Sequence, residues 1–162
     1  MRKNPALAMA TGGIIAALYV ALTFVSQAFG MASGVIQVRL SEALTILPCF
    51  TAAAVPGLSI GCVLANLLTG CAPWDVVFGS VATLIGAMGT RVMKDHVGWA
   101  WIPPVLSNAI IIPFVLQRVY GVPDAWWFLA LTVGAGELIS CGLLGILVAK
   151  AASRIPQLRE NG

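Results

Sequence analysis

The sequence predicts an all-α membrane protein with six transmembrane helices and with both the N- and C-termini cytoplasmic. The first observation behind this prediction is composition. Of the 162 residues, 59% are hydrophobic and only 9% are charged, whereas a soluble domain carries roughly a quarter charged residues. The second is spacing, because apolar segments broken by Gly, Pro or charge follow one another along the chain. A span needs about 20 apolar residues, so we expect a single membrane domain over residues 1–162.

Breaks in the apolar pattern define six candidate spans. They cover residues 6–29, 41–54, 57–71, 74–93, 101–119 and 125–150. The second and third are short for a membrane crossing. They meet at Val55-Pro56-Gly57, which is typical of a turn. The alternative is one long bent span at this place, which gives five helices.

The distribution of positive charge favours six spans over five. With six, seven of the nine basic residues lie on the cytoplasmic side, as the positive-inside rule expects, and only Arg39 and Arg118 lie outside. With five, the C-terminal basic cluster would lie outside. The inner set is Arg2, Lys3, Arg91, Lys94, Lys150, Arg154 and Arg159. This bias explains the net charge of +3, so we predict no nucleic-acid partner.

The sequence lacks the motifs of several other classes of protein, namely secreted, metal-binding, nucleotide-hydrolysing and triad-containing catalytic proteins. Arg2 and Lys3 before an apolar stretch are also typical of a signal peptide, but the stretch is long and has no clear cleavage site, so we expect a retained first helix. The four cysteines show no metal-type pairing. There is no phosphate-binding loop and no histidine-based triad pattern. We therefore expect no metal, no cofactor and no catalytic residue, and any ATP hydrolysis must occur on another chain.

Five polar residues interrupt the apolar segments. An unpaired ionisable group in a bilayer costs several kcal/mol, so such groups usually pair with each other or face a cavity. The sharpest case is Glu137, which follows Gly134-Ala135-Gly136 near the middle of the last segment. We expect it to contact a ligand or carry a proton, the alternative being a buried salt bridge to Arg39 or Arg118. The five residues are Glu42, Asn66, Asp75, Asn108 and Glu137.

The segment before Glu42 reads as an extended loop. Gly30 and Gly34 loosen it, and the residues from Val35 to Arg39 alternate between apolar and polar. We expect it at the outer surface, where it could cover a pocket. Ser41 is a suitable N-cap for the next helix. Arg39 and Glu42 could also form no more than an interfacial ion pair.

The first candidate helix carries a stripe of small residues. Gly13, Ala17 and Ala21 lie four apart, which places them on one helix face. Small residues let a second helix approach closely in lipid. One interpretation is packing within the chain, and the other is a docking face for a different membrane subunit. The similar pattern of Gly57, Gly61 and Ala65 favours packing within the chain.

Five groups of residues along the chain form recognisable motifs. They are Ile36-Gln37-Val38-Arg39-Leu40-Ser41-Glu42-Ala43-Leu44, Pro56-Gly57 with Gly61 and Ala65-Asn66, Asp75-Val76-Val77-Phe78-Gly79 with Ala82-Thr83, Ser107-Asn108-Ala109, and Gly136-Glu137. Together these motifs resemble the QueT family over nearly the whole chain. The resemblance implies a six-helix substrate-binding subunit, or S component, of an energy-coupling factor (ECF) transporter in a bacterial plasma membrane. It also implies three partner subunits, one transmembrane coupling subunit and two cytoplasmic ATPases, with the first-helix stripe as the docking surface.

The ligand implied by this resemblance is a queuosine precursor, 7-aminomethyl-7-deazaguanine or 7-cyano-7-deazaguanine. A guanine-like edge offers two adjacent N–H donors, which one carboxylate can accept together, and a carbonyl, which an amide or guanidinium can reach. Glu137 or Glu42 is the expected acceptor, and Asp75 is the expected partner of an aminomethyl cation. The candidate donors are Gln37, Arg39, Asn66 and Asn108. Trp74 could stack on the base, or anchor the membrane interface instead. Helix capping alone could explain Asp75.

Four other functions compete with this one. The same kind of importer subunit could bind another vitamin-like ligand. A proton-coupled secondary carrier would use Glu137, although the chain shows no obvious inverted repeat. In a structural or assembly protein, the polar groups would only hold helices together. An intramembrane enzyme ranks last, because no nucleophile and base pair is visible.

Overall fold

The computed structural model describes residues 5–31, 36–155 and 158. Within these ranges the chain forms helices and loops and contains no strand. Helices α5, η3 and α6 follow one another without a break and form one helical run, Trp126–Ala152. The elements in chain order are α1 (Pro5–Ala28), the 3-10 helix η1 (Leu40–Cys49), α2 (Ala54–Leu68), α3 (Pro73–Val92), the 3-10 helix η2 (Lys94–Trp99), α4 (Ile102–Arg118), α5 (Trp126–Glu137), the π-helix η3 (Leu138–Leu144) and α6 (Gly145–Ala152).

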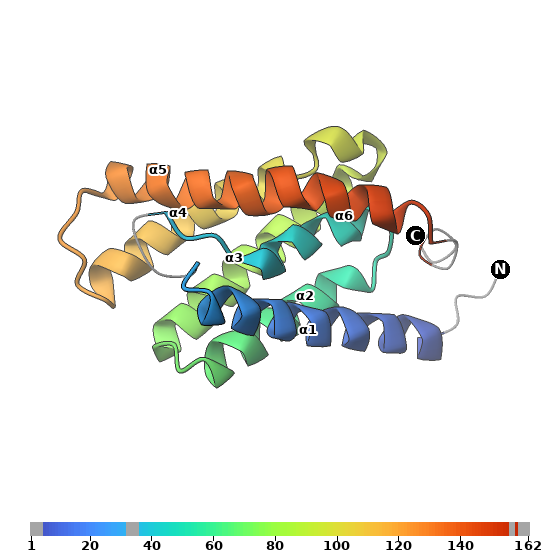
Figure 1. The fold of residues 1–162 in the computed structure, drawn as a ribbon, viewed down its shortest axis with the longest axis horizontal. Helices are drawn as coiled ribbons and strands as arrows, with labels where there is room; N and C mark the ends of the chain where they lie inside the picture. Colours follow the sequence, from blue (N-terminus) through green and yellow to red (C-terminus); the bar gives the residue numbers. More distant parts are fainter. Residues whose placement is uncertain (1–4, 32–35, 156–157, 159–162) are drawn as a thin grey trace.

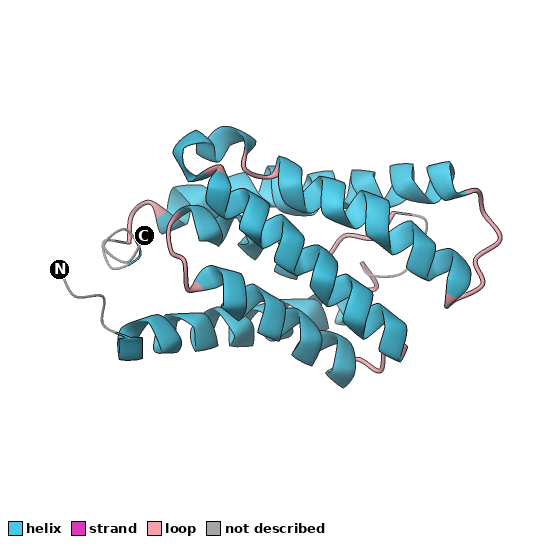
Figure 2. Ribbon diagram, turned by 180° about the vertical axis from the view of Figure 1, so that it is seen from behind, coloured by secondary structure: helices cyan, strands magenta, loops and turns pink. Residues whose placement is uncertain are grey.

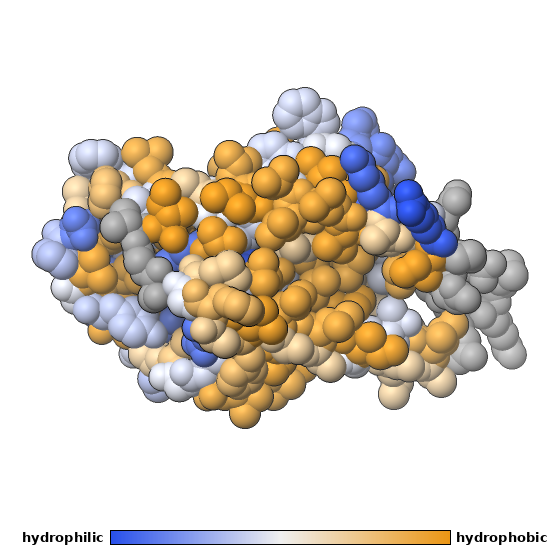
Figure 3. Space-filling view, in the orientation of Figure 1, coloured by the Kyte–Doolittle hydropathy of each residue, from blue (hydrophilic) through white to orange (hydrophobic). Residues whose placement is uncertain are grey.

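The helices have the lengths and surface of a membrane protein. Among the described residues, α1, α3 and the run Trp126–Ala152 are long and apolar enough to cross a membrane, and η1, α2 and α4 are shorter apolar helices. Figure 3 shows a broad apolar surface over α1 and the α5–α6 run, with hydrophilic atoms toward the two ends. Large apolar side chains such as Ile14, Leu131 and Leu147 are exposed, as expected of a surface that contacts lipid. The prediction of an all-α membrane protein is therefore confirmed, and six crossings stay a prediction.

The two ends of the helical structure lie together. Helix α1 begins and α6 ends at the same end of the molecule (Figure 1), and the reverse view shows the same arrangement (Figure 2). This geometry is what the prediction of both termini on one side requires. Which side faces the cytoplasm stays a prediction.

The expected span 41–54 takes a different form. Its first part is the 3-10 helix η1, and residues 50–53 form the turn that leads into α2. The turn expected at Val55-Pro56-Gly57 is wrong, because these residues lie in the first turn of α2. The first turn of a helix tolerates Pro, since its missing N–H would have no partner there. Ser41 is also not an N-cap: Arg39 holds that position, and no side chain caps η1.

Helix η1 lies in the middle of the bundle. It packs against α1, α3, η3 and α6, and its residues from Ser41 to Pro48 are all buried. In Figure 1 it runs between α1 and the α5–α6 run. A short apolar helix that neighbours surround on several sides is a core element. Glu42 is therefore carried into the centre of the protein.

Glycine makes the contact between α1 and α2 close. A Cβ added to Gly57 would lie 2.7 Å from the carbonyl oxygen of Gly12, and one on Gly61 would lie 2.9 Å from the Cβ of Tyr19. Real side chains do not fit at such distances, so only glycine allows these helices to meet here. The prediction that Gly57 and Gly61 serve packing within the chain is confirmed.

Candidate functional site

Polar side chains from four separate segments line one small cavity. The cavity has a volume of about 50 Å³, which is room for one or two water molecules. Five of its lining residues are among the eight that the sequence analysis proposed for substrate binding. These are Gln37 and Arg39 from the loop before η1, Asp75 from α3, Asn108 from α4 and Glu137 from α5. Ile112, Leu116 and Val133 complete the wall.

A larger hollow adjoins this polar cavity. It measures about 440 Å³ and shares Gln37, Leu116 and Val133 with the polar cavity. Part of its wall is formed by Asp124, in the loop before α5, and by Phe128, in the first turn of α5. We call this hollow the vestibule. Its volume falls in the range of small-molecule pockets, about 300–1,000 Å³. A third hollow, about 470 Å³ between α3 and α4, is lined almost wholly by apolar side chains, as suits lipid contact.

The segment 36–39 is held in place across the bundle. The Leu40 N–H donates to Ser26 Oγ on α1 at 2.8 Å, and the Arg39 N–H donates to Ser140 Oγ on η3 at 3.2 Å. A Cβ added to Gly136 would lie only 2.0 Å from the carbonyl oxygen of Gln37. The predicted extended loop is confirmed for residues 36–39, and residues 32–35 lie outside the described residues. The glycine before Glu137 thus lets the loop backbone lie directly against α5.

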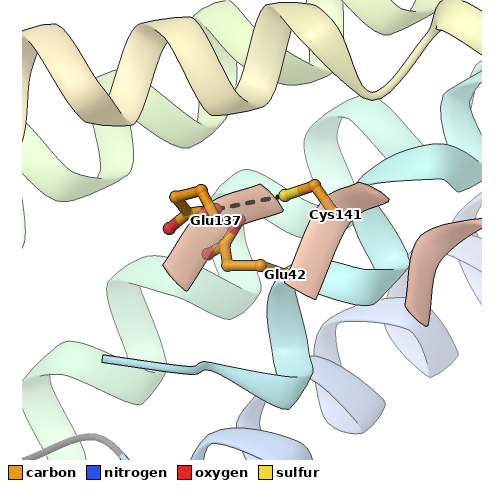
Figure 4. A group of neighbouring side chains, drawn as sticks. All are labelled: Glu42, Glu137 and Cys141. Carbon is orange, nitrogen blue, oxygen red and sulfur yellow. Dashed lines mark hydrogen bonds between the residues drawn. The ribbon is translucent and has the colours of Figure 1, made fainter. Parts of the chain in front are cut away.

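Behind the cavity wall, two carboxyl groups meet. Glu42 on η1 points toward Glu137 at the end of α5, with Cys141 of η3 beside them (Figure 4). The donor atoms of these three residues all lie within 4.8 Å of one another. Glu42 is 2% exposed and Glu137 is 9% exposed. The sequence placed both carboxylates in the site, and the structure brings them into one cluster.

Hydrogen bonds connect this cluster to its surroundings. The Tyr19 hydroxyl on α1 donates to Glu42 Oε1, and the Cys141 thiol donates to Glu137 Oε2 at 3.1 Å. The Thr45 hydroxyl in turn lies 3.4 Å from Cys141 Sγ. Two carboxylates and a sulfur could surround a metal ion, but a metal would need the deprotonated thiolate. Because the thiol donates its hydrogen to Glu137, we interpret the group as a hydrogen-bonded cluster.

Two buried polar atoms in this region have no partner. Glu42 Oε2 and Asn108 Nδ2 make no hydrogen bond of normal geometry to any described residue. Asn108 is 4% exposed, lines the cavity and lies beside Glu137. Unsatisfied buried donors and acceptors are rare and call for an explanation, such as a ligand that completes them.

Arg39 supplies the positive charge of the site. Within the described parts of the chain, Arg39 makes no direct ion pair with Glu42 or Glu137, so the structure does not support the alternative of a salt bridge from Arg39 to either residue. Its guanidinium instead interacts at longer range with Glu42, Asp75 and Glu137. Arg118 is exposed and lines the outer groove between α3 and α4. One guanidinium thus faces three carboxyl groups.

Asp75 accepts a hydrogen bond from a loop residue that lies outside the membrane-spanning helices. The hydroxyl of Tyr120, in the loop after α4, donates to Asp75 Oδ2 at 2.9 Å and accepts the Ala72 N–H at 3.2 Å. Partial burial raises the pKa of Tyr120 above its ordinary value, so the phenol remains a donor at neutral pH. Asp75 lies in the first turn of α3 without forming a side-chain cap, so capping alone does not explain it.

Three of the eight proposed residues do not line the cavity: Glu42 lies behind its wall, as described above, and Asn66 and Trp74 lie elsewhere. Asn66 is fully buried behind Gly79, with its Nδ2 3.6 Å from Cys62 Sγ. Trp74 is 62% exposed and stacks on Phe78 with ring centroids 6.0 Å apart. The interpretation of Trp74 as a stacking residue does not fit this position, which suits an interfacial anchor. Phe128 is the aromatic side chain that borders the vestibule.

Sequence reasoning did not find several residues of the site. Tyr19, Tyr120 and Cys141 contact its carboxyl groups, yet each lies in an ordinary apolar or loop context in the sequence. It also missed the π-helix η3, which starts directly after Glu137. Segments of π-helix often occur at functional sites, but no residue pattern here indicates one. Only the glycines before Glu137 signalled an irregular backbone.

The small-residue stripe of α1 faces outward. Gly13, Ala17 and Ala21 are exposed, and nothing lies within 4 Å of a Cβ added to Gly13. The neighbouring face, with Gly12 and Ala16, packs against α2 instead. Packing within the chain therefore does not explain the stripe.

Comparison with known proteins identifies the family of the chain. The family model described as QueT transporter matches residues 9–154. The chain is also similar to the queuosine precursor transporter QueT of Lactococcus lactis subsp. cremoris (strain MG1363), with 35% identity over 86 residues. That match covers 52% of this chain and 50% of the relative, so it spans about half the relative's length. No solved structure matches the chain.

Proposed function

The chain belongs to the QueT transporter family, and we propose that it is the substrate-binding membrane subunit of an ECF-type importer for a queuosine precursor. The observation that carries the proposal is the convergence of Gln37, Arg39, Asp75, Asn108 and Glu137 on one cavity. These side chains are distant in sequence and come from four segments. A bundle that needed polar groups only for helix packing would not have to gather them around a hollow.

The proposed ligand is a 7-deazaguanine, which matches the chemistry of the cavity. A carboxylate such as Glu137 can accept the two adjacent N–H groups of the guanine edge. The unpartnered Nδ2 of Asn108 can donate to the ring carbonyl. Asp75, on the opposite helix, can receive an aminomethyl cation, since charge-assisted hydrogen bonds are the stronger ones. The polar cavity is small, so the ring would occupy the vestibule, where Phe128 offers an aromatic contact.

Import then requires partner subunits. We propose one transmembrane coupling subunit and two cytoplasmic ATPases, in a bacterial plasma membrane, with ATP hydrolysis on those partners. The exposed stripe of Gly13, Ala17 and Ala21 is the proposed docking surface, because small residues allow close helix approach in lipid. Ala17→Leu should prevent co-purification with the coupling subunit and abolish uptake, while ligand binding by the isolated subunit stays intact. A matched exposed change on α3, Val77→Leu, should leave assembly unchanged.

The direct test is equilibrium dialysis with the purified subunit and no ATP. We expect retention of 7-aminomethyl-7-deazaguanine or 7-cyano-7-deazaguanine and none of riboflavin, an unrelated vitamin. Glu137→Gln should weaken binding by about 10- to 100-fold, since a hydrogen bond to a charged group contributes about 1.5–3 kcal/mol. Asp95→Asn, which removes an exposed carboxylate of η2, is the control. Equal and negligible retention of all three compounds would defeat the proposal.

One observation favours a second candidate, a proton-coupled carrier. The buried carboxyl pair of Glu42 and Glu137 has the composition of a proton site in a membrane transporter. In that case the protein reconstituted alone in liposomes should accumulate the deazaguanine when a pH gradient is imposed. The ECF proposal predicts no such uptake without the ATPase subunits.

A further inference from the structure

The charges around the cavity do not balance. Three carboxyl groups, on Glu42, Asp75 and Glu137, face the single guanidinium of Arg39. A buried charge without a counter-charge costs several kcal/mol, and two carboxylates that share a site do not both ionise readily. Among the described residues, Arg39 is the cation near these carboxyl groups, so protons or a ligand are the remaining sources of positive charge that we consider.

The geometry shows where one proton can be held. Glu42 and Glu137 present oxygens within 4.8 Å of each other and of the Cys141 sulfur, and both side chains are at least nine-tenths buried. Tyr19 and Cys141 satisfy one oxygen of each carboxyl group, yet Glu42 Oε2 is buried with no partner. A proton on Glu42 Oε2 would turn that acceptor into a donor, and the carboxyl group of Glu137 lies within 4.8 Å of the Glu42 carboxyl group.

Within residues 5–31, 36–155 and 158, the side chains that face the pair include one cation, Arg39. The titratable and charged groups facing it are Tyr19 from α1, Arg39 from the loop, Cys62 from α2, Asp75 from α3 and Cys141 from η3. The described residues of α4 contribute the neutral amide of Asn108. Asn108 lies beside Glu137, and its Nδ2 makes no hydrogen bond of normal geometry to the described residues, so a ligand in the cavity can accept from it.

We propose that the carboxyl pair of Glu42 and Glu137 holds one shared proton in the ligand-free protein, and that a ligand bearing an ammonium group releases this proton when it binds. The ammonium brings one positive charge into the site. The proton leaves the pair for solvent, so the total charge around the cavity is unchanged. No covalent bond to the ligand forms or breaks. This inference rests on the proposed function and names a property of the same site.

The proposal separates two ligands of nearly the same shape. An alkyl amine such as that of 7-aminomethyl-7-deazaguanine is protonated at neutral pH, as lysine is. The nitrile of 7-cyano-7-deazaguanine carries no charge. Only the aminomethyl compound should exchange for a proton. Its affinity should therefore rise with pH relative to that of the cyano compound, by up to about tenfold per pH unit.

Isothermal titration calorimetry of the purified subunit tests this exchange. At one pH, the binding heat is measured in two buffers of different ionisation enthalpy, which gives the number of protons released. We expect about one proton for the aminomethyl compound and none for the cyano compound, as the charge balance requires. Glu42→Gln, which keeps the side-chain shape and does not line the cavity, should abolish the release. Asp95→Asn should leave it unchanged.

The possible results are distinguishable. If both compounds bind with the same pH dependence and without buffer-dependent heat, the proton exchange is wrong and the proposed binding function stands. If neither compound binds at any pH in dialysis, both proposals are overturned. The pH series uses the unmodified protein, so it decides the question even if Glu42→Gln does not fold.

Discussion

At two contacts in this protein, which we call seams, glycine lets two backbone segments approach closely. One seam lies between α1 and α2 and is apolar, and the other lies between segment 36–39 and α5 and borders the polar cavity. Between α1 and α2, a Cβ on Gly57 would lie 2.7 Å from the Gly12 carbonyl oxygen. Between segment 36–39 and α5, a Cβ on Gly136 would lie 2.0 Å from the Gln37 carbonyl oxygen. The α1–α2 seam is packed with apolar residues such as Ile15 and Leu58. The loop–α5 seam holds the polar wall of the cavity.

The comparison teaches that close backbone approach is not itself a sign of function. Glycine removes the side-chain bulk in both places. What differs is the neighbouring side chain, because Gly136 directly precedes a buried carboxyl group, whereas Gly57 and Gly12 meet among apolar residues. If this interpretation is right, damage to the first seam should reduce stability, and damage to the second should reduce binding.

The largest effect on binding is expected from Gly136→Ala. The added Cβ cannot stand 2.0 Å from a backbone oxygen, so segment 36–39 and the side chains of Gln37 and Arg39 must move. We expect affinity for the deazaguanine to fall about 100-fold, equivalent to about 2.7 kcal/mol, as measured by equilibrium dialysis. Gly134→Ala is the control, because its Cβ would make an ordinary 3.7 Å contact with Ala109. Similar affinities for the two variants would break the distinction between the seams.

Gly57→Ala should act on stability instead. Its Cβ would overlap the backbone of Gly12, and overpacking of this kind costs about 1–3 kcal/mol. Thermal unfolding in detergent should show a lower midpoint, while the folded fraction binds ligand with unchanged affinity. Gly13→Ala, at an exposed position with nothing within 4 Å, should not lower the midpoint. A loss of affinity in folded Gly57→Ala protein would show that the α1–α2 seam also shapes the site.

Tyr120→Phe should have a smaller effect on binding. It removes the hydroxyl that donates to Asp75 Oδ2 and accepts the Ala72 N–H. Tyr120 positions Asp75 and does not itself line the cavity, so we expect affinity to fall only about 2- to 10-fold, equivalent to about 0.5–1.4 kcal/mol. Because burial raises the pKa of Tyr120, the phenol stays protonated from acid to neutral pH. The ratio of wild-type to variant affinity should therefore be constant over pH 5 to 8, which dialysis at several pH values would check.

The smallest effect is expected from Trp74→Ala. This indole is largely exposed and stacks on Phe78, away from the cavity lining. We expect affinity to change by less than about twofold, whereas Phe128→Ala at the vestibule should weaken binding several-fold, since an aromatic pair contributes about 0.5–1.5 kcal/mol. The reverse order in a dialysis comparison would restore Trp74 as the stacking residue.

Much of the site could be anticipated because its residues are conspicuous in their surroundings. Glu42, Asp75, Asn108 and Glu137 are polar groups inside apolar segments, and the cost of burying them implies a common purpose. Trp74 could not be placed in the same way, because an aromatic residue at a helix start suits an interface and a binding site equally. Tyr19 and Tyr120 gave no signal, since their partners lie 23 and 45 residues away in sequence.

The sequence by itself determined that this is an all-helical membrane protein and which few polar side chains need partners inside it. The reason is that composition and the spacing of apolar segments can be read directly from the residues, without knowledge of their tertiary contacts. The sequence also indicated the extended segment before η1. Only the tertiary structure decided that residues 40–49 form a buried 3-10 helix in the middle of the bundle, and that this helix carries Glu42 to Glu137. The reason is that the contact between Glu42 and Glu137 depends on how closely separate backbone segments approach each other. Glycines permit a close approach, but they do not specify which segments make it.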